Sequence, residues 1–345
     1  MHPPMQPGWI DAPHNKLRRR IFVLESGEAI EDLELSYAVH GDLSDSRLPL
    51  AIALCAIGST HHRLDFLIGE GLALDPRRLR ILAIDALGNG LSSSPSNSRS
   101  QPRLRFPRFA IRDMVNSQKL LIDDLGITSV ELVIGASMGG MQALQWAVSF
   151  PHLVRNVVAL TPMAKTTAWS GAINHAARLA LQSHDDDPGR QPDQLARRWE
   201  SWSVILQLIC ARTPSHVSAE FDGPNAVRRW LDARVGLWME QGADPLDWIY
   251  QSWAYDDHDV GRSSGFDGDT AAALRSIRAR TLIAAPPLDL YNPAEAARWA
   301  ASWIPGCEFL EISSDAGHMT ASALDANAAR LLNQGISAFL GKGSP

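Results

Sequence analysis

A serine within a turn of small residues is the first feature whose residue types and spacing could support chemistry. The stretch VIGASMGGMQALQWAVSFP, residues 133–151, runs from β-branched residues through Gly135-Ala136-Ser137-Met138-Gly139 into helical spacing. Small neighbours permit the sharp strand-to-helix turn that lifts a serine hydroxyl above a sheet. The N-terminus of the following helix would direct backbone N–H groups at developing negative charge. The stretch therefore predicts that Ser137 is a nucleophile rather than a spacer in a glycine-rich connection.

A serine nucleophile needs a base, and the base needs an acid that orients it. His318, in SSDAGHMTAS, follows a late strand-like run and precedes the last helical pattern, so it is the predicted base. Asp289, in LIAAPPLDLYNP, follows the apolar part of a predicted strand, where ligand-facing residues of parallel sheets gather, so it is the predicted acid. The histidines and aspartates less favoured by position are His61, His62, His184, His216, His258, Asp256, Asp257, Asp259 and Asp315.

Acyl transfer through Ser137 would also need two hydrogen-bond donors for the oxyanion. The backbone N–H of Met138, directly after the serine, is the first candidate. The backbone N–H of Ile57 is the second, because Ile57 follows the apolar run that begins at residue 49 and Gly58 lets the chain turn. The alternative, that residues 55–59 form only a connecting turn, stays open at this point.

The elements that must position these groups alternate as in a parallel sheet with right-handed crossovers. Strands are predicted over 49–58, 80–90, 130–135, 154–162, 278–293 and 307–313, helices over 109–127, 138–150, 294–304 and a C-terminal stretch ending near Leu340, and a hairpin around Ser26-Gly27. We expect an N-terminal arm over 1–20, an α/β core over 21–164 and 271–345, and a helical cap over 165–270. The cap holds seven of the 11 tryptophans, which fill a core or line a pocket.

The amino-acid composition of the chain excludes some classes of function. The 345 residues are 45% hydrophobic with a net charge of −6, so there is no general attraction to nucleic acid or anionic membranes, and Arg18-Arg19-Arg20 is expected to be solvated. Cys55, Cys210 and Cys307 are far apart and lack metal-ligand spacing, which favours a reducing compartment and no metal. No leader or long apolar span is evident, so a cytoplasmic enzyme is expected. The polar stretch 183–194 is expected to be a surface loop.

With these residues assembled, the chain resembles the homoserine O-acetyltransferase-like group of the α/β-hydrolase superfamily. FVLESGEAIEDLELSYAVHGDL is similar to the opening strands of that group, GASMGGMQALQWA to its nucleophile segment, and IRARTLIAAPPLDLYNP and AGH to its acid and base segments. The resemblance covers roughly 21–163 and 275–340. It implies an α/β-hydrolase fold with an inserted helical cap, Ser137, Asp289 and His318 as a catalytic triad, no cofactor, and a homodimer through the cap.

The chain also departs from that group at three places. Met319 stands where the acetyltransferases carry Asp after the base, ALGNGLSSSPSNS replaces a glycine-rich loop, and the cap keeps Arg178 but little else of the expected segment. The loop and WIYQSWAYDDHDVG are more similar to an esterase side branch. We therefore expect hydrolysis of a small acetyl-type ester through an acyl-serine intermediate. The alternative is O-acyl transfer from acyl-CoA, with acetyl-CoA as co-substrate, to homoserine or a related hydroxyl.

Two other classes of function fit the sequence less well. A non-catalytic binding module predicts loss of a triad member, and all three are present. A metal-dependent hydrolase would have to use His61, His62 and Asp65, the only candidate cluster in the sequence, and Asp65 is expected on a helix face.

Overall fold

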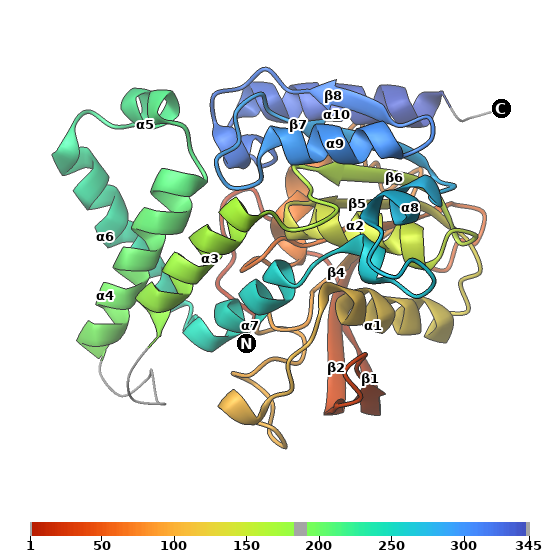
Figure 1. Ribbon diagram of the computed structural model, residues 1–345, viewed down its shortest axis with the longest axis horizontal. Helices are drawn as coiled ribbons and strands as arrows, with labels where there is room; N and C mark the ends of the chain where they lie inside the picture. Colours follow the sequence, from red (N-terminus) through yellow and green to blue (C-terminus); the bar gives the residue numbers. More distant parts are fainter. Residues whose placement is uncertain (1, 183–191, 343–345) are drawn as a thin grey trace.

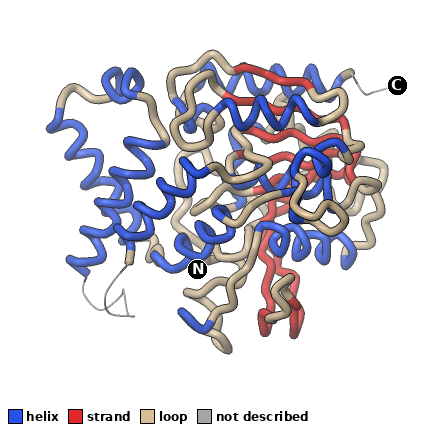
Figure 2. Tube along the Cα trace, viewed as in Figure 1, coloured by secondary structure: helices blue, strands red, loops and turns tan. Residues whose placement is uncertain are grey.

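A mostly parallel sheet forms the centre of the molecule. The computed structural model describes residues 2–182 and 192–342. The eight strands lie in the order β1-β2-β4-β3-β5-β6-β7-β8. Figure 2 shows the strands in red, gathered in one part of the molecule. Only the pairings β1 with β2 and β2 with β4 are antiparallel. Their bounds are β1 His14–Val23, β2 Ala29–His40, β3 Leu50–Leu54, β4 Arg80–Ile84, β5 Val130–Ala136, β6 Val154–Leu160, β7 Arg280–Ala285 and β8 Glu308–Glu311. The predicted α/β architecture is confirmed.

Helices flank this sheet and continue into a separate group at one side of the molecule (Figure 1). The α-helices are α1 Ile111–Asp124, α2 Met138–Ser149, α3 Ala168–Leu181, α4 Pro192–Trp202, α5 Pro214–Glu220, α6 Pro224–Glu240, α7 Pro245–Asp256, α8 Thr270–Arg275, α9 Ala294–Trp303 and α10 Ala326–Gly341. The short helical segments are η1 His61–Leu67, η2 Arg103–Arg105, η3 Ser203–Cys210, η4 Val260–Arg262 and η5 Gly317–Thr320. Within the described ranges, no helix has the length and apolar character that crossing a bilayer requires.

The central strands are apolar throughout because both faces of the sheet are covered. On one face, Ile52 packs in a cluster with side chains of α1, α2, α8 and α9. On the other, Ala53 packs with side chains of η1 and α10. Adjacent strand residues thus point into different cores, and the carboxyl ends of the strands are held at one edge.

The sheet begins earlier than the sequence analysis expected. β1 starts at His14, so the prediction that all of residues 1–20 form an arm is wrong for 14–20. Lys16 and Arg18 point to solvent and pair with Glu34 on β2, at 2.6 and 2.7 Å. In the stretch 14–20 only Leu17 is buried. A charged strand of this kind is typical of a sheet edge, where charge discourages pairing with another chain.

The helical segment between β6 and β7 is joined to the core through a narrow neck. Lys165 and Asp259 form an isolated antiparallel bridge, and their side chains pair at 3.0 Å. Helices α3 to α7 lie between these two residues, and α4 to α6 stand away from the sheet at the left of Figure 1. Residues 260–270, predicted to belong to the cap, instead lie beside the core, where Val260 is fully buried. Residues 183–191, including His184, lie outside the described residues, and the predicted loop over 183–194 is wrong at its end because α4 begins at Pro192.

Candidate active site

Ser137 occupies a strained turn between β5 and α2. Its backbone has φ 57° and ψ −121°, a conformation that residues with a side chain rarely adopt. The Ser137 N–H donates to the Leu160 carbonyl at 2.8 Å, which ties the turn to the end of β6. The residue is 2% exposed. The chain therefore holds this hydroxyl in a fixed place at the carboxyl edge of the sheet.

The glycines around Ser137 are required by close backbone contacts. A Cβ atom on Gly135 would lie 2.1 Å from the Gly139 carbonyl oxygen, and one on Gly139 would lie 2.5 Å from the Leu54 carbonyl oxygen. Neither neighbour is a flexible side chain that could move aside. These contacts explain why the turn needs small residues.

We expect Gly135→Ala to lower the free energy of unfolding by about 3 kcal/mol or more, because the added methyl overpacks a rigid backbone contact. Denaturant unfolding measures this change. Gly236→Ala is the matched control, since Gly236 lies in α6 with no atom within 4 Å of the added methyl. That substitution should be neutral or stabilise by up to about 1 kcal/mol. Equal stability of the two variants would contradict the tight packing of the turn.

The structure brings His318 and Asp289 to Ser137. His318, in η5 after β8, places Nε2 2.8 Å from Ser137 Oγ and Nδ1 2.8 Å from Asp289 Oδ2. Asp289 follows β7, and its Oδ1 accepts the N–H groups of Tyr291 and Asn292, each at 2.9 Å. All three residues of the group are buried. The two backbone N–H groups therefore hold one carboxylate oxygen of Asp289, and the other oxygen can fix the orientation of the imidazole.

The competing histidines and aspartates have other surroundings. His258 lies in the neck, where burial lowers the pKa of its imidazole to about 3. His216 lies 3.4 Å from Glu220 and 3.5 Å from Asp315. Asp256 pairs with Arg178, Asp257 with Arg262, and Asp259 with Lys165. His61 and His62 belong to a separate polar cluster in η1.

The two expected oxyanion donors lie where β3 meets the start of α2. The backbone N–H groups of Ile57 and Met138 have no acceptor among the described residues. The next N–H along, that of Gly58, donates to Gln251 Oε1 at 2.8 Å and is therefore engaged. Both N–H groups are therefore unpaired within the described residues, as a donor to an oxyanion must be.

Gln142, which the sequence analysis missed, links the two sides of this donor pair. Its Nε2 donates to the carbonyls of Cys55 and Met138, both at 3.2 Å. Its Oε1 accepts from Gln118, whose own oxygen accepts from the Trp146 indole. All three side chains are fully buried. A polar residue on an otherwise apolar helix was the one available signal, and it could not reveal what the side chain binds.

Two tyrosines that were not predicted from the sequence, Tyr255 and Tyr291, form one wall of the site. Burial raises the pKa of Tyr255 far above its usual value, and its hydroxyl donates a hydrogen bond to Asn292 Oδ1. The Tyr255 ring stacks on Tyr291 at 5.6 Å between centroids, and Tyr291 meets the His318 ring edge-on at 5.0 Å. Both phenols therefore stay protonated and act as neutral hydrogen-bonding walls.

A second wall carries an ion pair between a buried arginine and a half-buried aspartate. Arg178 lies 2.6 Å from Asp256 and 3.1 Å from Ser252. The other Asp256 oxygen accepts from Asn174, and Asn174 accepts from the Tyr291 hydroxyl. The positive charge of Arg178 is therefore neutralised by Asp256 and connected to the aromatic wall.

A cleft of about 610 Å³ opens between the helical segment and the loop after β4. Four of the tryptophans predicted to fill a core or line a pocket border it, namely Trp199, Trp202, Trp238 and Trp248. Gly58 and Gln251 also line it, so the cleft reaches the loop that carries Ile57. Buried Asp247 is part of the same lining, and burial raises the pKa of its carboxyl to about 7. At its helical side the cleft combines these tryptophans with polar residues, among them Glu240, Gln241 and Asp244.

Comparisons with known proteins agree with this architecture. The family model for the alpha/beta hydrolase fold matches residues 58–321. A probable esterase from Corynebacterium glutamicum is 30% identical over 86% of each chain, and a homoserine O-acetyltransferase from Thermobifida fusca is also 30% identical over 86% of each chain. The solved structure of the acetyl esterase MekB superposes with a TM-score of 0.87 at 26% identity, covering 95% of this chain and 97% of that one. The chain is an enzyme and belongs to the alpha/beta hydrolase fold family.

Proposed function

We propose that this enzyme hydrolyses a small carboxylic ester, of acetyl type, through an acyl-Ser137 intermediate. The observation that carries the proposal is the continuous contact from Asp289 through His318 to Ser137, with 2.8 Å at each step. This is the arrangement in which a serine, a base and an orienting acid act as one unit.

In the first half-reaction, His318 Nε2 takes the proton of Ser137 as Oγ attacks the ester carbonyl. The Ile57 and Met138 N–H groups stabilise the tetrahedral oxyanion, because they are fixed, unpaired donors. His318 then gives the proton to the departing alcohol. Asp289 holds the imidazole tautomer and stabilises the imidazolium without taking the proton. In the second half-reaction, water attacks the acyl group by the same route.

The surroundings of Arg178 favour water over homoserine as the acceptor. Homoserine carries an α-carboxylate, and a buried arginine is the natural partner for such a group. Here the guanidinium is already bound to Asp256, so a second carboxylate would enter next to an existing one. The close superposition on an acetyl esterase supports the same choice.

The test is product analysis with two substrate mixtures. We expect the purified enzyme to release acetate from a small acetate ester at a rate that added homoserine does not change. With acetyl-CoA, homoserine should produce no extra free thiol. Thiol release that depends on homoserine would instead establish the transferase alternative, in which acetyl-CoA is the co-substrate.

Two expectations accompany this proposal. Cys55, Cys210 and Cys307 are all unpaired, which supports a reducing compartment such as the cytoplasm. The homodimer through the helical cap stays a prediction, and light scattering of the purified chain would measure it.

A further inference from the structure

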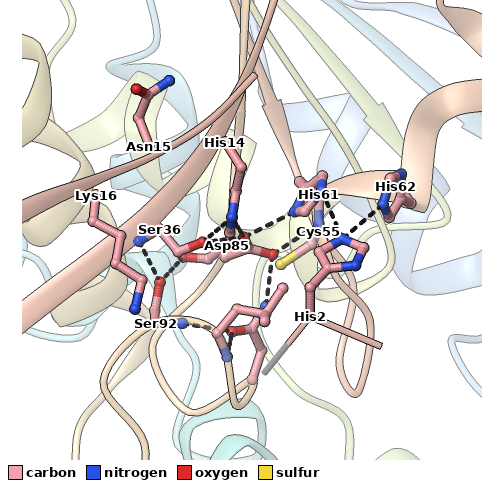
Figure 3. A network of polar contacts seen from close by, with 12 residues as sticks. His2, His14, Asn15, Lys16, Ser36, Cys55, His61, His62, Asp85 and Ser92 are labelled. Carbon is pink, nitrogen blue, oxygen red and sulfur yellow. Dashed lines mark hydrogen bonds and ion pairs between the residues drawn. The ribbon is translucent and has the colours of Figure 1, made fainter. Parts of the chain in front are cut away.

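Three histidine side chains converge at a point outside the proposed catalytic group. The Nε2 atom of His2 lies 3.0 Å from that of His62 and 3.4 Å from that of His61 (Figure 3). All three atoms lie within 4.8 Å of one another. His61 and His62 come from η1, after the loop that carries Ile57, whereas His2 comes from the N-terminal segment.

The opposite nitrogen of each ring is already committed to an acceptor. His61 Nδ1 lies 2.9 Å from Asp85, His62 Nδ1 lies 2.7 Å from Asp65, and His2 Nδ1 lies 2.7 Å from the Pro3 carbonyl. Carboxylates and carbonyls only accept hydrogen bonds, so each Nδ1 carries the hydrogen. In the neutral rings, the three Nε2 atoms therefore present lone pairs to one another. Lone pairs at 3.0 Å repel unless a cation lies between them.

The cluster is largely closed to solvent on the side of η1. The side chains of His61 and His62 are each only 3% exposed. Imidazoles that point their Nε2 lone pairs toward one point are the form that binds transition metals.

The carboxylates behind the rings are themselves held in place. Asp85 accepts hydrogen bonds from Ser36 Oγ at 2.6 Å and Asn89 at 2.9 Å, and Asp65 accepts the Ile10 N–H at 2.8 Å. A carboxylate hydrogen-bonded to the far nitrogen of a ligating histidine fixes the ring and makes it more basic. Two of the three histidines have this support.

We propose that His2, His61 and His62 bind a divalent transition-metal ion, with Zn²⁺ as the best-fitting occupant. Tetrahedral Zn²⁺ with Zn–N bonds of about 2.0–2.1 Å places its nitrogen ligands about 3.3 Å apart. The two separations in the structure, 3.0 and 3.4 Å, lie on either side of that value. A cavity of about 620 Å³ is lined by His2 and His14, so the cluster borders open space on the side of His2.

Such an ion would fasten the N-terminal segment to the loop after β3. That segment already lies around His62, because the Trp9 ring stacks on the His62 ring at 4.1 Å. No metal was expected from the sequence, because the three cysteines lack metal-ligand spacing and Asp65 was expected on a helix face. The third nitrogen ligand comes from residue 2, almost 60 positions away.

The test is metal binding by the full chain without a histidine tag. After chelator treatment and dialysis, we expect titration calorimetry to show one Zn²⁺ per chain. Co²⁺ should give the intense visible absorption of a tetrahedral site. Asp65→Asn should weaken binding by about 10–100-fold, since it removes the carboxylate behind His62. His2→Gln removes a ligand and should weaken binding more than Asp65→Asn does.

His2 is exposed, so His2→Gln should leave the metal-free fold unchanged, as circular dichroism would check. His175→Gln is the matched control, because His175 is exposed on α3, away from the cluster, and its loss should leave Zn²⁺ affinity unchanged. The proposal is overturned if the wild-type chain takes up no Zn²⁺, or if His2→Gln and His175→Gln bind it equally well. Both outcomes are independent of ester hydrolysis.

Discussion

Ser137→Ala is expected to lower kcat for ester hydrolysis by about 10⁶, the loss typical of removing a triad nucleophile. The reason is geometric, since the Ser137 hydroxyl is the group to which His318 Nε2 points, at 2.8 Å. A residual rate about 10³–10⁴ above that of water should persist, because the oxyanion donors and the binding cleft are unchanged. Steady-state kinetics with a chromogenic acetate ester measures the effect.

Ser302→Ala provides the matched control for this experiment. Ser302 is exposed on α9, and its hydroxyl bonds only to the Trp299 carbonyl within its own helix. The control should keep wild-type kcat and KM. If Ser137→Ala were as active as Ser302→Ala, the acyl-serine mechanism would be wrong.

Asp289→Asn is expected to lower kcat by about 10⁴. The reason is that an amide cannot accept the hydrogen bonds from His318 and from the backbone N–H groups at the same time. With its NH₂ facing His318, the amide forces Nδ1 to accept, so Nε2 carries the hydrogen and cannot take the proton from Ser137. With its oxygen facing His318, the NH₂ meets the N–H groups of Tyr291 and Asn292, which need an acceptor. Each orientation removes one function of the carboxylate.

The control for Asp289→Asn is Asp315→Asn, in the same loop as His318. Asp315 lies 3.5 Å from His216 and was one of the competing acids in the sequence. Its substitution should leave kcat within about a factor of two or three, as expected for an exposed ion pair. A mild defect in Asp289→Asn together with a severe one in Asp315→Asn would move the acid role to Asp315.

The core strands could be predicted from sequence because burial on both faces leaves a local signature of continuous apolar residues. The start of β1 could not be predicted, because its charged residues resemble those of a solvated arm. Their partner, Glu34, lies on the neighbouring strand β2. The end of the cap was misplaced for a similar reason. Val260 is buried against helices of the core that are distant in sequence.

The residues of the candidate site differ in the same way. Some are marked by their neighbours in the sequence, and others only by partners that are distant in the sequence. Ser137 is recognisable because its turn imposes small residues within two positions on either side. Gln142 and Tyr255 carry no such pattern, because their importance comes from partners in the loop after β3, on α1 and in the loop after β7. His2 is the extreme case, since nothing near it in the sequence marks it as a partner of η1.

The narrow neck at Lys165 and Asp259 has an evolutionary consequence. Because the helical segment leaves and rejoins the core at paired residues, its chain can lengthen without interrupting a strand of the sheet. Change in length is most easily accommodated in α4 to α6, because α7 is tied to the core through Gln251, which accepts the Gly58 N–H. Evolution can therefore vary the outer helices of the segment more freely than those that border the Ser137 group.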